Sequence, residues 1–177
     1  MALSKSLDDG PFPEVGAIRT IAILPALFKL LEQCVQTKLH NYVETHNILH
    51  RGQRGFRSES SCSTNIHDLL KHFIATRVKL ELQKAQGVQA ARRRRHFVLF
   101  LDLKKAFDSV LRCLLIIKLQ KLGIPDSLIS AIRLFLSDTS ILVDSQTIKT
   151  NIGVPQGSVT SPLLFNLYIN DLLENLS

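Results

Sequence analysis

The first half of the chain alternates apolar and polar residues with a helical period. Between Pro25 and Glu44, apolar side chains recur at steps of three and four residues, which predicts an amphipathic helix; they are Leu27, Phe28, Leu31, Cys34, Val35 and Leu39. A second helix is predicted to begin near Ser63, whose hydroxyl can cap it, and to run through Ile74. The glycines within residues 50–55 allow a tight turn between the two helices.

One short segment has a different, continuously apolar pattern. Phe97 to Leu101 reads Phe-Val-Leu-Phe-Leu, which is typical of a strand buried on both faces of a sheet. A helix is predicted to follow from about Ser109 to Leu122, because the Gly-Ile-Pro at 123–125 ends a helix.

The next segment combines a predicted helix with a predicted hairpin. A helix capped by Asp126 or Ser127 is predicted to reach about Leu136. Polar and β-branched residues alternate over 140–152, which predicts a β-hairpin with its turn near Asp144.

The composition is that of an ordinary globular domain. Of the 177 residues, 45% are hydrophobic and 21% are charged, which is enough apolar material for a core of its own. No apolar run reaches the ~18 residues that span a bilayer, and the first residues lack the apolar core of a secretory signal. We therefore expect a soluble, intracellular protein with no membrane partner.

The cysteines and histidines do not form a metal or disulfide pattern. Cys34, Cys62 and Cys113 are odd in number and far apart, so they build neither a disulfide framework nor a zinc site. We expect small buried or half-buried thiols. Because the six histidines show no ligand spacing either, any metal should be held by oxygen atoms.

The positive charge is concentrated in one region. Of the net charge of +7, residues 61–100 contribute +6, from eight Lys/Arg and two Asp/Glu. Four of these cations form the run Arg92 to Arg95, inside a segment, 87–95, that is predicted to be a mobile connection. A solvated loop, phosphate contact and nuclear import all remain open for this run.

Asp102 is a candidate metal ligand because of its place after the predicted strand. Alternation along the strand puts it on the face opposite Leu101 and Leu103. A carboxylate at a strand end beside a cleft is a natural ligand for Mg²⁺, which prefers hard oxygen donors. Both Asp102 and the nearby Asp108 could instead cap the helix that follows.

A second candidate segment bends immediately before a predicted helix. Residues 151–162 read NIGVPQGSVTSP, in which two glycines and a proline set a bent backbone around Gln156, whose amide offers a donor and an acceptor. Ser161 followed by Pro162 then predicts the start of a final helix. By itself, this is a well-made turn into a helix.

Taken together, these segments resemble reverse transcriptases of non-LTR, LINE-like retrotransposons. LDLKKAFDSV followed by GVPQGSVTSPLLFNLYINDL is similar to the A and B motifs of that family. Upstream, RTIAILPALFKLLE resembles its fingers segment, and QRGFR leading to SSCST resembles its QxGFRxxxST block. The resemblance covers roughly residues 17–176.

The resemblance implies an α+β fold, the fingers and a partial palm of a right-hand polymerase, and a role for individual residues. Asp102 would be the catalytic metal ligand, together with the carbonyl of Leu103. The incoming nucleotide would be bound by Lys29, Lys105, Ala106, Phe107, Gln156 and Gly157, with Phe107 excluding a 2′-hydroxyl. Arg19 and Arg57 would contact phosphate or template; an ordinary surface role remains open for these two arginines and for Lys29.

The resemblance also implies what this chain lacks. The family uses two Mg²⁺ ions, RNA template, DNA primer and dNTPs, and its second carboxylate motif, YxDD, and its thumb are expected beyond Ser177. We therefore expect an amino-terminal fragment, inactive alone, with these parts: lead-in 1–16, fingers 17–95, palm strand 96–109, fingers 110–156 and palm helix 157–177. Departures include Thr160, which replaces a usual leucine. A non-catalytic nucleic-acid-binding remnant, or a leftover without a role, is the alternative.

Overall fold

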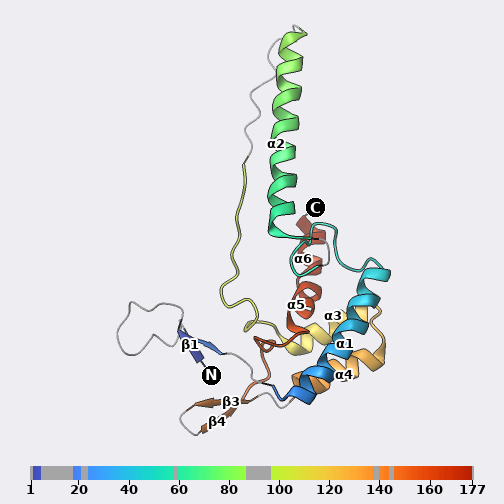
Figure 1. The fold of residues 1–177 in the computed structure, drawn as a ribbon, viewed down its shortest axis with the longest axis vertical. Coiled ribbons are helices and arrows are strands. Elements are labelled where there is room, and N and C mark those ends of the chain that lie inside the picture. The colour runs from blue at the N-terminus through green and yellow to red at the C-terminus, as the bar shows by residue number, and fades with distance from the viewer. Residues whose placement is uncertain are drawn as a thin grey trace. The chain divides into compact units, whose positions relative to one another are not determined.

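The computed structural model describes residues 2–4, 18–20, 24–57, 60–86, 97–137, 140–143 and 146–176. The chain divides into two compact units, which are described separately below: Met1–Gln53 with Lys105–Ser177, and Arg54–Lys104. Most described residues are helical, and the strands form two separate two-stranded ladders (Figure 1). The predicted connection at 87–95, with its arginine run, lies outside the described residues.

The described helices of the first unit are α1 (Ala26–Thr45), α3 (Arg112–Lys121), α4 (Asp126–Leu136), α5 (Ser161–Tyr168) and α6 (Asn170–Leu176) (Figure 1). Side chains from the first four of these helices share one apolar cluster. Helix α3 packs against α4 and α5, and α1 packs against α4. The predicted helices at 25–44 and 126–136 are confirmed, whereas α3 begins three residues later than predicted.

Helix α1 buries a narrower face than its sequence pattern predicts. Val35, Leu39 and Val43 are buried, but Leu27 is 81% exposed and Leu31 is 52% exposed. Because a neighbouring helix contacts one line of side chains at three- and four-residue steps, apolar residues beside that line stay in solvent. The expected face was therefore too broad at its amino-terminal end.

The junction between α3 and α4 follows the predicted glycine and proline signals. Gly123 has a φ of 74°, the left-handed conformation that ends a helix, and its carbonyl accepts a hydrogen bond from Tyr42 Oη at 2.7 Å. Pro125 occupies the N-cap of α4 and makes no side-chain cap. The predicted caps, Asp126 and Ser127, are thus inside the helix, where Asp126 favours the positive end of the dipole.

The two hairpins differ in how well the sequence predicted them. Strands β3 (Ser140–Val143) and β4 (Gln146–Lys149) pair antiparallel, which confirms the predicted hairpin; its turn at 144–145 lies outside the described residues. Strands β1 (Ala2–Ser4) and β2 (Ile18–Thr20) also pair antiparallel, so the lead-in contributes a strand that was not predicted.

The second unit contains the long helix α2 (Cys62–Ala85). It is capped two residues earlier than predicted: Thr64 N donates to Ser61 Oγ at 3.3 Å, and Ser61 N donates to Thr64 Oγ1 at 2.9 Å. This reciprocal pair has the geometry of a capping box, so Ser61 rather than Ser63 starts the helix. None of the described helices, α2 included, is both long and apolar enough to cross a membrane.

The prediction of a buried strand at Phe97–Leu101 is wrong. These residues form no strand, and Phe97 is 88% exposed. A strand is held by backbone hydrogen bonds from neighbouring strands, and the two ladders in the described part of the chain pair only β1 with β2 and β3 with β4. Without a paired neighbour, an apolar run has no reason to adopt the strand conformation.

Two of the cysteines also differ from expectation. Cys34 and Cys113 are exposed rather than buried, and nothing is described for the Cys62 side chain. Cys34 lies on the solvent side of α1 beside buried Val35, and Cys113 lines a surface pocket on α3. A thiol is small and weakly polar, so either environment accommodates it.

The predicted final helix is interrupted at Ile169, which separates α5 from α6. No proline or glycine lies at this position; instead the buried Asn170 uses its side chain for tertiary contacts. Its Oδ1 accepts from His50 N at 2.7 Å, and its Nδ2 donates to Ile48 O at 3.2 Å. These bonds fix the segment after α1 against the end of α5.

Replacing Lys118 with methionine is expected to raise the pKa of Asp171. Lys118 Nζ donates to Asp171 Oδ1 at 2.8 Å and to Tyr168 O at 2.6 Å, and the hydrogen bond from Lys118 lowers the pKa of the Asp171 carboxyl. A lowered pKa in the folded state adds stability above the unfolded pKa, which is lost as pH falls through the folded value. NMR titration of Asp171 in both proteins measures this; an unchanged midpoint would contradict the pairing.

Candidate functional site

The segment that follows Asp102 and the segment around Gln156 meet in the first unit. Val154 N donates to Phe107 O at 2.9 Å, and Gly153 N donates to Val110 O at 2.7 Å. An isolated antiparallel bridge joins Leu111 to Ile152. Residues 105–111 and 152–156, distant in sequence, therefore lie side by side through backbone hydrogen bonds.

The contact requires a glycine at one position. Gly153 has a φ of 82°, and a Cβ added there would lie 3.1 Å from both the Cα and the carbonyl oxygen of Asp108. Only glycine accepts both the left-handed conformation and so close an approach of another backbone. The sequence predicted a bent backbone here, and the structure supplies the reason.

Gln156 is held by an acidic side chain from the other segment. Its Nε2 donates to Asp108 Oδ1 at 2.9 Å, which directs the amide nitrogen toward the other segment and leaves the side-chain carbonyl to accept from another donor. The helix that follows begins at Arg112 with Leu111 at its N-cap, so Asp108 is not its cap. The role of Asp108 in the structure is to orient Gln156.

The Phe107 ring packs against a second aromatic ring. Its ring stacks on Phe165 of α5, with 5.0 Å between the centroids and 27° between the planes. Phe107 is half-buried and contacts the apolar cluster, so its orientation is fixed by the core. A ring anchored in this way can limit the volume available to a neighbouring ligand.

The backbone before Phe107 turns sharply. Lys105 has a φ of 53°, which is uncommon for a residue with a side chain and stores local strain. Ser109 stabilises the turn, since its N donates to Lys105 O and its Oγ donates to Ala106 O, both at 3.0 Å. Gly157, on the opposite segment, is exposed with a φ of 95°.

A buried acid that the sequence analysis missed supports the Gln156 turn from α1. Glu32 is 1% exposed, and its Oε1 accepts hydrogen bonds from Ser158 Oγ, from Thr160 Oγ1 at 2.8 Å and from Thr160 N at 3.3 Å. A signal was present: Glu32 stands three residues before Val35, on the line of buried positions that continues to Leu39 and Val43. An acid at a core position calls for partners elsewhere in the fold.

Arg112 is the second residue that was missed, and it binds backbone carbonyls from two segments, the end of α4 and residues 150–153. Its guanidinium donates to Gly153 O at 2.7 Å, Leu136 O at 2.5 Å, Thr150 O at 2.8 Å and Ile152 O at 3.2 Å. Burial lowers the pKa of Arg112. No sequence signal identifies it, because its partners are main-chain atoms at least 24 residues away.

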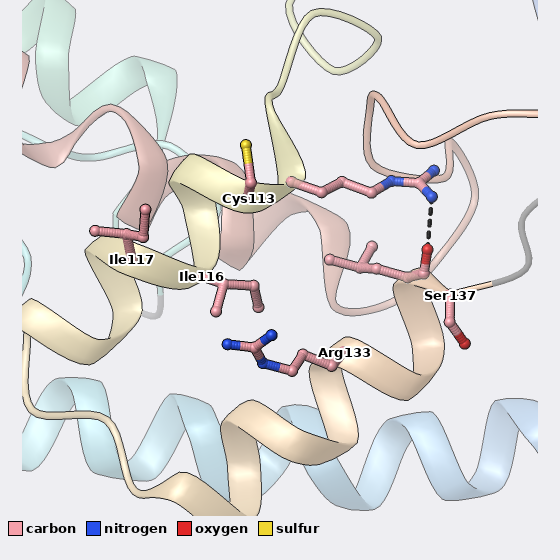
Figure 2. A pocket seen from close by; sticks show the side chains of 7 residues that line it. Cys113, Ile116, Ile117, Arg133 and Ser137 are labelled. Carbon is pink, nitrogen blue, oxygen red and sulfur yellow. Dashed lines mark hydrogen bonds between the residues drawn. The ribbon is translucent and has the colours of Figure 1, made fainter.

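Beside Arg112 lies an open pocket of about 480 Å³, between α3 and α4 (Figure 2). Its lining is apolar at the Ile116 and Ile117 side chains and carries the Arg133 guanidinium, the Cys113 thiol and Ser137. The pocket is separate from the Gln156 turn in sequence, and none of the predicted site residues lines it.

The remaining predicted residues are placed as follows. Lys29 is exposed on α1, one turn before Glu32. Asp102 and Leu103 belong to the second unit and are exposed, so their predicted place beside Gln156 stays a prediction. Arg57 is half-buried in the second unit, and Arg19 lies in β2 with no side-chain environment described.

The donor set suits a hard metal ion only in part. Within the described residues, no cluster of three or more His, Cys, Asp or Glu side chains could hold a metal ion. Asp102 offers an exposed carboxylate, and Mg²⁺ is commonly held by one or two carboxylates together with substrate phosphates. Asp102 therefore fits as one ligand of an ion that substrate would help to hold.

Comparison with known proteins identifies the family. Residues 7–177 match the family described as reverse transcriptase (RNA-dependent DNA polymerase). The chain belongs to this family, which confirms the resemblance found in the motifs and supports a polymerase fold.

Its relatives come from mobile elements. The chain is 31% identical over 159 residues to the probable RNA-directed DNA polymerase from transposon BS of Drosophila melanogaster, covering 87% of this chain and 16% of that protein. It is 32% identical over 174 residues to the retrovirus-related Pol polyprotein from the type-1 retrotransposable element R2 of Popillia japonica, covering 95% of this chain and 22% of that protein. The chain thus spans about a fifth of the length of these relatives.

Proposed function

We propose that this chain is the nucleotide-binding part of an RNA-directed DNA polymerase of a non-LTR retrotransposon. The supporting observation is the contact between the two segments that carry Phe107 and Gln156. The hydrogen bond from Gln156 to Asp108 joins these segments, and their backbones approach closely at Gly153. Family membership over nearly the whole chain supports the same reading. The partners would be an RNA template, a DNA primer and dNTPs.

In the proposed reaction the primer 3′-hydroxyl gives up its proton to water and its oxygen bonds to the α-phosphorus of the dNTP, while the bond from that phosphorus to the pyrophosphate oxygen breaks. Divalent metal, for which we propose Mg²⁺, supplies charge neutralisation for the attacking and leaving oxygens when bound. The Asp102 carboxylate and the Leu103 carbonyl would hold it. For the subdomains we propose the limits expected from the sequence, with the fingers at 17–95 and 110–156 and the palm at 96–109 and 157–177.

The chain's own residues would bind and orient the nucleotide. The Phe107 ring, supported by Phe165, would exclude a 2′-hydroxyl by volume. The amides of Lys105 and Ala106 and the Lys29 ammonium would face the triphosphate. The free carbonyl of Gln156 would contact the nucleotide beside Gly157, while Arg19 and Arg57 would contact phosphate or template.

The purified 177-residue chain is expected not to extend a primer. Two divalent ions close together repel each other, and Asp102 alone supplies too little negative charge to hold both. Incubation with RNA template, DNA primer, dNTPs and Mg²⁺ tests this on a sequencing gel. Template-dependent incorporation that Asp102→Asn abolishes would contradict the expected inactivity.

Binding provides the positive test of the proposed function. A dNTP complementary to the next template base should bind the chain–primer–template mixture more tightly than a mismatched dNTP, measured with a fluorescent nucleotide. Gln156→Ala should weaken this binding about fivefold, the effect of one lost hydrogen bond. Equal binding of the two dNTPs would refute the proposal and favour a nucleic-acid-binding remnant.

A further inference from the structure

Glu32 is unusual among the buried residues because its environment satisfies only half of its carboxylate. Oε1 accepts all three hydrogen bonds, from Ser158 and Thr160. Oε2 is buried and has no hydrogen-bond partner within the described part of the chain. A buried carboxylate is costly to desolvate, and an apolar side chain of similar size is often the more stable choice at such a position.

The three bonds hold the start of α5. Thr160 is the N-cap residue of α5, and its side chain makes no cap. Its N–H donates to Glu32 Oε1 from α1. Ser161 Oγ donates to Pro155 O at 2.8 Å, which closes the turn around Gln156.

We propose that Glu32 is the positioning residue of the Gln156 turn, acting through Ser158 and Thr160. It fixes residues 155–161 against α1, the helix that also carries Lys29 one turn earlier. Two elements proposed to contact the same nucleotide are thereby joined at a buried point. The inference rests on the proposed function only for its effect on nucleotide binding; the effect on the turn is independent of it.

Thr160 bonds to Glu32 through its side-chain hydroxyl as well as through its backbone N–H. Thr160 Oγ1 donates to Glu32 Oε1 at 2.8 Å and lies 3.1 Å from Ser158 Oγ. A residue without a hydroxyl at this position would keep only the backbone bond to Glu32.

Hydrogen exchange of the 177-residue chain tests the structural half. Glu32→Leu keeps the volume but removes the acceptor, so exchange of the Thr160 amide should rise about tenfold while α3 and α4 keep their protection. Glu32→Gln retains Oε1 and should stay close to the unmodified chain. Gln33→Leu, at an exposed neighbour on α1, is the matched control.

Unchanged exchange at Thr160 in Glu32→Leu would overturn the proposal, since it would reduce Glu32 to a space-filling residue. Should Glu32→Leu unfold, Thr160→Val removes one donor at nearly constant shape and must still loosen residues 155–161 more than α3 or α4. Equal loosening throughout the first unit would also overturn the proposal.

Nucleotide binding tests the functional half. Glu32→Leu should weaken binding of the complementary dNTP about fivefold. Adding Gln156→Ala should weaken that binding no further, because Glu32 acts through the same turn. Additive losses would overturn the positioning role. If the unmodified chain does not distinguish complementary from mismatched dNTP, the proposed function fails, while the exchange result still decides whether Glu32 holds the turn.

Discussion

Replacing Arg112 with methionine is expected to lower the free energy of unfolding by about 3–4 kcal/mol, because hydrogen bonds from a charged donor are worth roughly 1.5–3 kcal/mol each and are not additive. The variant leaves four carbonyl oxygens without this donor, among them Leu136 O at the end of α4 and Gly153 O. The loss would be a large share of the stability of an ordinary domain. Urea unfolding followed by circular dichroism measures it.

Arg112→Lys separates charge from geometry. A lysine keeps the positive charge but lacks the planar fork that reaches several carbonyls, so about half of the loss, roughly 2 kcal/mol, should remain. Arg133→Met is the matched control, because Arg133 lines the same pocket with an exposed side chain. It should change the free energy of unfolding by less than about 0.5 kcal/mol. A similarly small change in Arg112→Met would contradict its organising role.

Local patterns predicted the elements whose stability is local. The helix at 25–44, the helix at 126–136 and the hairpin at 140–152 were found because periodicity, alternation and turn residues act over a few positions. The boundary at Gly123 and Pro125 was found for the same reason. The prediction of the individual cap residues failed, because several neighbouring residues with hydroxyl or carboxylate groups could each have capped the helix.

The failures share a dependence on distant partners. The apolar run at 97–101 could become a strand only beside another strand, which its own sequence does not supply. The break at Ile169 depends on contacts between Asn170 and residues 48 and 50, more than 100 positions away. Such information is absent from any short window of sequence.

The candidate site divides in the same way. Family resemblance singled out Phe107, Gln156 and Gly157, and the structure brings the segments that carry them together. The resemblance could not identify Asp108, Glu32 and Arg112 as the residues that hold those segments, because their roles depend on tertiary hydrogen bonds. Of these three residues, only Glu32 could have been recognised from the sequence, as an acid at a core-facing position of α1.

Replacing Gly153 with alanine is expected to lower the free energy of unfolding by about 3 kcal/mol, since the left-handed conformation costs a side chain roughly 1–2 kcal/mol and the close contact adds to it. The added Cβ would lie 3.1 Å from Asp108 Cα and 3.1 Å from Asp108 O, which are backbone atoms that cannot rotate away. To relieve the contact, the two segments must separate, which weakens the bonds Gly153 N to Val110 O and Val154 N to Phe107 O.

Substitutions at two other glycines separate the cost of the left-handed conformation from the cost of the close contact. Gly123 has a φ of 74°, but a Cβ there would meet nothing closer than Tyr42 Oη at 3.8 Å, so Gly123→Ala should show only the conformational cost of about 1 kcal/mol. Gly55→Ala, where a Cβ has open space, should be nearly neutral. Urea unfolding of the three variants gives the contact energy as the difference between positions 153 and 123. If that difference is zero, the two segments do not approach as closely as the structure shows, and the junction proposed to bind the nucleotide is more loosely built than its hydrogen bonds imply.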